Sequence, residues 1–163
     1  MKKVAVVMGS DSDLPVVEKT INILQKFEVP FEVHVYSAHR TPSIVSEYAK
    51  TASEAGFGVI IAAAGKAAHL AGAIASYTVL PVIGLPIKSS ALGGLDALFS
   101  TVQMPSGIPV ATVAIDGAEN AALLAVSILA LEDSALRNKL LDFRKAASDQ
   151  VLEKNFEIER KFN

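Results

Sequence analysis

Short segments that are apolar at every position recur along this chain, and segments with helical periodicity separate them. Residues 4–8 and 59–63 show no alternation of polar and apolar side chains, which is typical of parallel strands covered on both faces. Residues 14–27 place four apolar side chains on one helical face: Val17, Ile21, Leu24 and Phe27. This repetition predicts an α/β fold, with a central parallel sheet between two layers of helices.

The pattern extends over the whole chain. The expected strands are residues 4–8, 31–36, 59–63, 81–85 and 108–115, and the expected helices are residues 14–27, 42–55, 67–77, 92–102, 118–131 and 134–154. A length of 163 residues suits a sizeable core, so we expect residues 1–163 to form a single domain. Residues 132–163 carry 14 of the 32 charged residues and are expected to form solvated C-terminal helices.

Charge and composition limit the partners of this chain. The net charge is −2 with both signs mixed, which indicates neither a nucleic-acid partner nor a polybasic membrane segment. There is no cysteine, which excludes disulfides and thiolate chemistry. The first strand begins at residue 4 and is too short to be the apolar core of a signal peptide, so a cytoplasmic location is expected.

Two long stretches, residues 67–87 and 97–115, carry no Asp, Glu, Lys or Arg. The first approaches the length of a membrane span, but Gly72, Pro81 and Gly84 interrupt it and most of its residues are small. Buried strands and a closely packed helix explain it better than a membrane does. A chain of this size has difficulty hiding so much apolar surface, so we expect further copies of the chain to cover part of it.

Polar residues follow the first strand, at the end of the sheet where α/β proteins bind ligands. Residues 9–13 (GSDSD) lead into the helix at 14–27, which Ser12 or Asp13 can cap. Hydroxyl and N–H groups at a helix start suit a phosphate, whereas an aspartate suits a sugar diol or an amine. A ligand-binding loop and a simple helix cap are both compatible with these residues.

The hexapeptide Ser37-Ala38-His39-Arg40-Thr41-Pro42 joins the second strand to a helix that Thr41 can cap and that Pro42 suits at its first position. Histidine is the side chain best suited to moving a proton near neutral pH, and arginine grips a phosphate with two N–H groups. Because the pair stands at a loop tip, we interpret it as functional rather than as a structural histidine beside a surface charge.

The loop after the third strand, residues 64–72 (AGKAAHLAG), has small residues that let the backbone approach a ligand closely. Its His69 can act on that ligand or can satisfy buried backbone groups, and the sequence leaves both open. Several other site classes are missing. The three histidines lack the spacing of metal ligands. There is no Gly-x-Ser-x-Gly elbow of a Ser-His-Asp hydrolase and no Gly-x-Gly-x-x-Gly fingerprint of a dinucleotide-binding fold. The third strand is not followed by the phosphoacceptor aspartate of a receiver domain.

Seven groups of residues carry a family resemblance, in this order: Met8-Gly9-Ser10-Asp11-Ser12-Asp13, the hexapeptide 37–42, Ala67-Ala68-His69-Leu70, Leu80-Pro81-Val82-Ile83-Gly84, Gly94-Leu95-Asp96, Val102-Gln103-Met104-Pro105 and residues 107–115. Together they resemble the bacterial N5-carboxyaminoimidazole ribonucleotide mutases, the class I form of the phosphoribosylaminoimidazole carboxylase catalytic subunit family. The resemblance covers about residues 4–154. Each group alone is weak, but the combination is highly specific.

The resemblance implies a flavodoxin-like three-layer α/β/α sandwich that assembles as a homo-octamer. It implies a reaction of purine biosynthesis that moves a carboxylate from the exocyclic amine of an aminoimidazole ribonucleotide to ring carbon C4, without a metal, ATP or an organic cofactor. His39 would be the catalytic proton carrier. The implied substrate-binding residues are Ser10, Asp13, Ser37, Arg40, Gly65, His69 and Leu70, with Ser12 and Lys66 as further candidates.

Within this resemblance, Arg40 and the serines of residues 9–13 would lie near the phosphate, Asp13 on the ribose, and Gly65, His69 and Leu70 over a carbon dioxide pocket. The third loop departs from the family pattern Ala-Gly-Gly-Ala-Ala-His-Leu-Pro-Gly at two positions, Lys66 and Ala71. Two alternatives remain. One is a carboxylase that uses free carbon dioxide, which the Ala67-Ala68-His69-Leu70 segment argues against. The other is a non-catalytic nucleotide-binding protein of the same fold, which could lose His39.

Overall fold

The computed structural model describes all residues from Met1 to Asn163. Its centre is a five-stranded parallel sheet in the order β2-β1-β3-β4-β5. The strands are β1 (Lys3–Met8), β2 (Phe31–Val35), β3 (Phe57–Gly65), β4 (Val82–Ile87) and β5 (Ala111–Thr112). The helices are α1 (Leu14–Lys26), α2 (Pro42–Thr51), α3 (Leu70–Ala75), α4 (Leu95–Val102), α5 (Ala118–Leu129) and α6 (Ser134–Phe162), and a 3-10 turn η1 (Asp11–Asp13) precedes α1.

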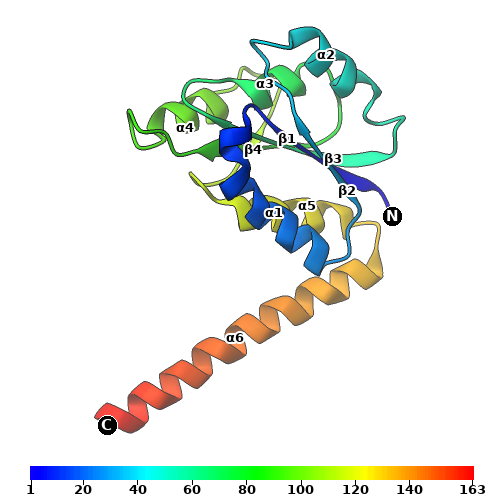
Figure 1. The fold of residues 1–163 in the computed structure, drawn as a ribbon. Helices are drawn as coiled ribbons and strands as arrows, with labels where there is room; N and C mark the ends of the chain where they lie inside the picture. The colour runs from blue at the N-terminus through cyan, green and yellow to red at the C-terminus, as the bar shows by residue number, and fades with distance from the viewer.

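Helices cover both faces of the sheet (Figure 1). α1, α5 and the start of α6 pack on one face, and α2, α3 and α4 lie on the other. Val4, Val6 and Met8 of β1 belong to the core beneath α1 and α5. Ala5 and Val7 belong to the core beneath α2 and α3. The central strands are therefore buried on both faces, and the strand order is that of a flavodoxin-like sandwich, as predicted.

The fifth strand is much shorter than residues 108–115, the range expected from the sequence. β5 has only two residues, and Ile83 pairs with Ala111 in its ladder. Continuing that register places Pro109 beside Pro81. Neither proline has an N–H group to donate, so the ladder cannot extend toward the amino end of the strand.

Two helices begin later than expected, and for α4 the cause is left-handed backbone inside the expected range. Lys66 has a φ of 57°, and α3 begins at Leu70 rather than at residue 67. Gly93 and Gly94 have φ values of 63° and 97°, and α4 begins at Leu95 rather than at residue 92. A right-handed helix cannot include Gly93 and Gly94.

Two predicted cap residues, Asp13 and Thr41, occupy the N-cap positions of their helices, but neither side chain makes the expected cap hydrogen bond. The Oγ of Ser10 caps η1 instead, by accepting from the N–H of Ser12 at 3.3 Å. Thr41 makes no side-chain cap bond to α2. Its hydroxyl accepts from the Ser37 N–H at 3.0 Å and donates to the Ser37 carbonyl at 2.9 Å, which closes the loop after β2 on itself.

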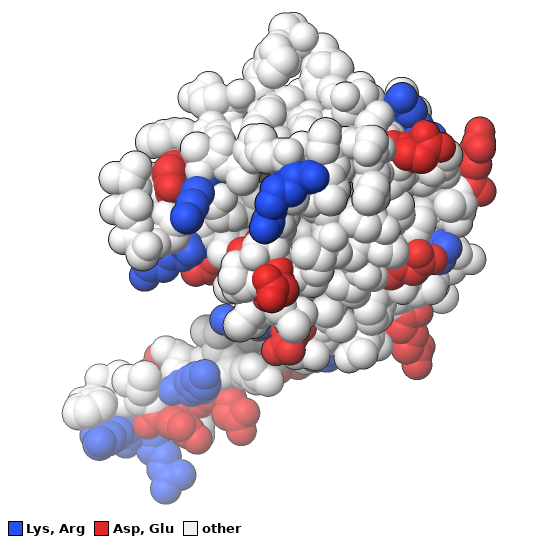
Figure 2. Space-filling model, turned by 45° about the horizontal axis from the view of Figure 1, so that its top comes forward, with Lys and Arg blue, Asp and Glu red and all other residues white.

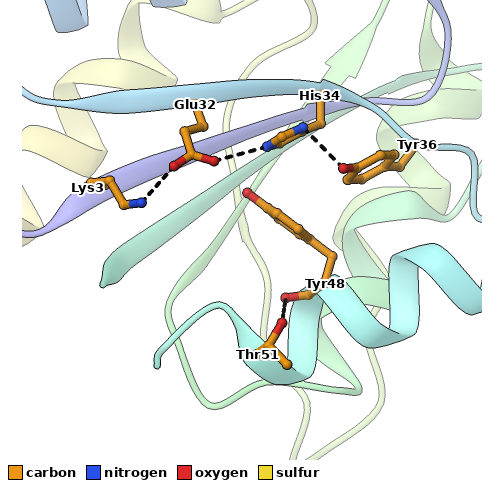
Figure 3. A network of polar contacts seen from close by, with 6 residues as sticks. All are labelled: Lys3, Glu32, His34, Tyr36, Tyr48 and Thr51. Carbon is orange, nitrogen blue, oxygen red and sulfur yellow. Dashed lines mark hydrogen bonds and ion pairs between the residues drawn. The ribbon is translucent and has the colours of Figure 1, made fainter. Parts of the chain in front are cut away.

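A polar and aromatic network holds the edge strand β2 against β1 and α2 (Figure 3). Lys3 Nζ donates to Glu32 at 2.6 Å and lowers the pKa of that carboxyl. His34 lies 3.4 Å from Glu32 on one side and 3.1 Å from the Tyr36 hydroxyl on the other. The ring of Tyr48 meets both aromatic rings edge-on, and burial raises its pKa. The network fixes β2 directly before the loop that follows it.

α6 is one continuous helix, longer than expected, that projects away from the sheet layers (Figure 1). Only Leu136 and Leu140 are buried, and Phe143 packs on Phe27 with ring centroids 5.5 Å apart. Charges of both signs crowd its outer part (Figure 2). That part also exposes five large apolar side chains: Val151, Leu152, Phe156, Ile158 and Phe162. None of the helices has the length and apolar character that crossing a membrane requires.

Gly84 in β4 provides a test of how closely the sheet and α4 pack. A Cβ at this position would lie 2.2 Å from Thr101 Cγ2 and 3.0 Å from Val110 Cγ1. We expect Gly84→Ala to lower the free energy of unfolding by about 1–3 kcal/mol, because the overpacked layers must shift. Urea unfolding followed by circular dichroism measures this. Gly9→Ala is the matched control, since its Cβ would come no closer than 3.8 Å to another atom, and equal losses in both variants would contradict the packing.

Candidate functional site

The loops after β1, β2, β3 and β4 surround a cavity of about 500 Å³ at the carboxyl edge of the sheet. This is the topological switch point, between β1 and β3, where sheets of this order bind ligands. The cavity brings together all but one of the residues that the sequence singled out: Ser10, Ser12, Asp13, Ser37, His39, Arg40, Gly65, Lys66 and Leu70.

The loop after β1 presents hydroxyl groups and one carboxyl group to the cavity. Ser12 Oγ donates to Ser10 Oγ at 2.9 Å, and Ser10 Oγ donates to Asp11 at 3.2 Å. Asp13 is only 7% exposed. Burial raises the pKa of its carboxyl, a backbone hydrogen bond from Ser10 lowers it in part, and the nearby Asp11 raises it. A buried carboxyl of this kind can accept hydrogen bonds from a ligand's hydroxyl groups.

The loop after β2 places a cation and a free imidazole side by side. Arg40 Nη2 donates to the carbonyl of Gly9 at 3.2 Å, which ties this loop to the one after β1. The N–H of Arg40 donates to Ser37 Oγ at 3.3 Å. His39 is exposed at the cavity and its ring makes no hydrogen bond to another protein group. Its two ring nitrogens are therefore available to exchange a proton with a ligand.

His69 is the predicted site residue that the structure does not bring to the cavity lining. Its Nδ1–H donates to the carbonyl of Ser100 in α4. The ring lies over Gly72, where a Cβ would come 1.9 Å from its Nε2. His69 therefore links α3 to α4 and requires glycine at position 72. Its contact with a substrate stays a prediction.

The sequence missed the loop after β4, which supplies Lys88, Ser89 and Ser90 to the cavity. The N–H of Lys88 donates to Asp116 at 2.9 Å, and the Ser89 hydroxyl lies within 3.1 Å of both carboxylate oxygens of Asp96. The expected strand ended at residue 85, whereas β4 reaches residue 87 and ends beside Lys88. One feature of the sequence could have identified this loop: Lys88 is the first charged residue after the uncharged stretch 67–87.

Lys66, in the loop after β3, has a backbone conformation that glycine adopts without strain. Its φ of 57° lies in the left-handed region, which disfavours a side chain with a Cβ by about 1 kcal/mol. This is the position where the family pattern has glycine. Two small residues of the same loop, Gly65 and Ala68, line the cavity together with Lys66. No three His, Asp or Glu side chains in the chain lie close enough together to hold a metal ion.

The fold and the cavity define a flavodoxin-like protein with a polar small-molecule site at its switch point. The sequence matches the AIR carboxylase family over residues 3–150, and the chain belongs to that family. It is 59% identical to the N5-carboxyaminoimidazole ribonucleotide mutase of Pyrococcus horikoshii, over 96% of this chain and 88% of that protein. It is 53% identical to the phosphoribosylaminoimidazole carboxylase of Saccharomyces cerevisiae, over 96% of this chain but only 27% of that protein.

The solved structures agree with this assignment. The crystal structure of Treponema denticola PurE superposes with a TM-score of 0.85 at 28% identity and covers 94% of this chain and 96% of that one. The likeness therefore extends over nearly the full length of both chains, which is what membership of one family requires.

The strain at Lys66 predicts a stabilising substitution. We expect Lys66→Gly to raise Tm by about 2–4 °C, because glycine adopts a φ of 57° without a steric penalty. Differential scanning calorimetry measures the change. Lys19→Gly, at an exposed position inside α1, is the control and should lower Tm, because glycine destabilises a helix interior. A drop in Tm for Lys66→Gly would show that the left-handed conformation is not the one in solution.

Proposed function

We propose that this protein is an isomerase of purine biosynthesis that interconverts N5-carboxyaminoimidazole ribonucleotide and 4-carboxy-5-aminoimidazole ribonucleotide. The observation that carries this proposal is the free imidazole of His39, which stands in the cavity between polar loops that suit a nucleotide and a small apolar wall. The names of the bacterial and archaeal relatives support the same reaction. The chain acts as one mutase domain over residues 1–163.

The polar side of the cavity binds the ribonucleotide. Arg40 is a planar cation suited to a phosphate, and the hydroxyls of Ser10 and Ser12 stand beside it at the start of η1. Asp13 accepts hydrogen bonds from the ribose hydroxyls, and Ser37 lines the same wall. The hydrogen bond from Arg40 to the β1 loop fixes the relative positions of these groups before the substrate binds.

His39 moves one proton twice. The protonated imidazole gives its proton to the carbamate nitrogen, the N–C bond breaks, and carbon dioxide leaves the exocyclic amine. Carbon C4 of the electron-rich imidazole then attacks that carbon dioxide and forms the new C–C bond. The neutral His39 ring takes the proton from C4, which restores the aromatic ring and the starting state of the enzyme. The reaction therefore consumes no proton and needs no added carbon dioxide.

The apolar wall keeps the carbon dioxide beside C4. It consists of Ala64, Gly65, Ala68, Leu70 and Ile87, at the ends of β3 and β4 and the start of α3. Small and apolar side chains offer water no hydrogen-bond partners and hold the released molecule close to the carbon that attacks it. Gly65 and Leu70 thus act as substrate-site residues, and His69 supports them by fixing α3 against α4.

Turnover of two substrates separates this function from its alternative, a carboxylase that uses free carbon dioxide. We expect fast conversion of N5-carboxyaminoimidazole ribonucleotide and no conversion of aminoimidazole ribonucleotide at low bicarbonate, both followed by absorbance. The reverse result would make the protein a carboxylase, as the name of the yeast relative suggests for that protein. Tight binding of the nucleotides without turnover would make it a binding protein.

The role of His39 has its own test. We expect His39→Asn to lower kcat by at least about 100-fold, the usual contribution of a positioned acid–base group, while nucleotide affinity changes little. Single-turnover absorbance and isothermal titration calorimetry measure the two quantities. His34→Asn is the control for removal of an imidazole, since His34 belongs to β2 and does not line the cavity. Near-normal turnover in His39→Asn would remove His39 from the mechanism.

We further propose that the protein works as a homo-oligomer, an octamer by its family resemblance, in the cytoplasm. The exposed apolar side chains support association. They occur on the outer part of α6 and on α4, where Leu95, Phe99 and Val102 are 45–57% exposed. Burial of these side chains between copies of the chain would remove from water the surface that a single chain leaves uncovered.

Charges placed on α6 test this assembly. We expect Leu152→Asp with Phe156→Asp, one turn apart on the helix, to shift the protein to smaller species in light scattering. Neither side chain is packed in the single chain, so the fold should survive. Lys154→Asp adds the same residue on the opposite side of the helix and should leave the mass unchanged. An unchanged mass in the double variant, or a monomeric parent protein, would contradict the assembly.

A further inference from the structure

Two lysines stand next to each other at the carboxyl edge of the sheet. Gly65 of β3 pairs with Ile87 of β4, and Lys66 and Lys88 are the residues that follow them. Neighbouring strands lie about 4.8 Å apart, so the two lysines follow backbone positions that are adjacent in the sheet. Both line the cavity. Two ammonium groups in one cavity repel each other unless an anion lies between them.

Neither lysine forms an ion pair within the chain. The four ion pairs of the structure lie elsewhere and involve neither side chain. The acidic residues closest to the β4 loop hold its conformation, since Asp116 accepts the backbone N–H of Lys88 and Asp96 accepts the hydroxyl of the next residue. The cavity lining therefore has three cations and one carboxyl group, although the whole chain has a net charge of −2.

The cations are distributed over two ends of the cavity. Arg40 stands after β2 beside the serines of the β1 loop, whereas Lys66 and Lys88 stand after β3 and β4. The guanidinium of Arg40 lies at the end of β1, where it donates to the Gly9 carbonyl. One strand separates β1 from β4, which places this group roughly 10 Å from the end of β4. A cavity of this kind suits a ligand with an anionic group at each end.

We propose that Lys66 and Lys88 form a carboxylate subsite, which binds the migrating carboxylate of the substrate and of the product at the end opposite the phosphate. This inference rests on the proposed function, and it assigns to these two residues a recognition role of their own. It also explains why a lysine occupies a left-handed position, because backbone strain is found where a side chain is needed for function.

The subsite acts mainly on affinity. The carboxylate is an anion in both the substrate and the product, and the carbon dioxide between them is neutral. Cations therefore stabilise the two bound end states more than the step that connects them. Removing one cation should raise KM for carboxylated nucleotides without lowering kcat, which is the pattern of binding energy lost from the ground state.

The test compares nucleotides with and without the carboxylate. We expect Lys66→Met and Lys88→Met each to weaken binding of 4-carboxy-5-aminoimidazole ribonucleotide by about tenfold, while binding of aminoimidazole ribonucleotide changes less than twofold. Isothermal titration calorimetry measures both affinities, and initial rates give KM and kcat. Methionine keeps the length of the stem. Lys19→Met removes an exposed lysine outside the cavity and should change neither affinity.

Two other outcomes of the binding test overturn the subsite. Equal weakening for both nucleotides would place the lysines at the phosphate. Unchanged affinities in both variants would make them solvated surface charges. Lys66→Gly repeats the test in a chain without the backbone strain and should show the same selective loss. If the parent protein discriminates between the nucleotides through the lysines but turns over neither, the proposed function fails and the subsite stands.

Discussion

Burial of the central strands on both faces is the constraint on which the rest of the structure depends. Strands that are covered by helices on both faces pair in parallel, because each connection must return through a helix. All carboxyl ends therefore lie on one edge, where residues far apart in the chain meet. The hydrogen bond from Arg40 to the carbonyl of Gly9 exists because β2 lies beside β1. The cavity is a consequence of strand direction and order, and its chemistry comes from the loops.

The strand and helix order could be predicted because the core strands are apolar throughout and the helices between them are periodic. The predicted strand length and helix cap differ from the structure where a single local group determines them. Pro81 and Pro109 stop the β5 ladder, a restriction that depends on the register between two strands and is not visible in either alone. Thr41 bonds to Ser37 rather than to its helix, since a hydroxyl has several backbone partners within reach. The outer part of α6 continues because nothing in residues 155–162 stops a helix.

The part of the candidate site that could be predicted lies in loops whose polar composition differs from that of the strands before them. Residues 9–13 and 37–42 are polar segments after apolar strands, and the structure places both at the cavity. Lys88 was missed because its position depends on the pairing of β4 with β3, which extends two residues beyond the expected strand. His69 shows the opposite case, because the same imidazole suits a ligand contact or a backbone contact, and only the packing of α3 on α4 distinguishes them.

The two ends of the cavity are built differently, and the difference matches the proposed reaction. At the end proposed to bind the phosphate, Ser37, Thr41 and Arg40 are held by hydrogen bonds within and between loops. At the other end, the Lys66 side chain makes no hydrogen bond and extends from a backbone that has no regular structure. The phosphate stays in place throughout the reaction, so its contacts gain from being preorganised. The carboxylate moves between two atoms, and long, unbonded lysine side chains can follow it from one to the other.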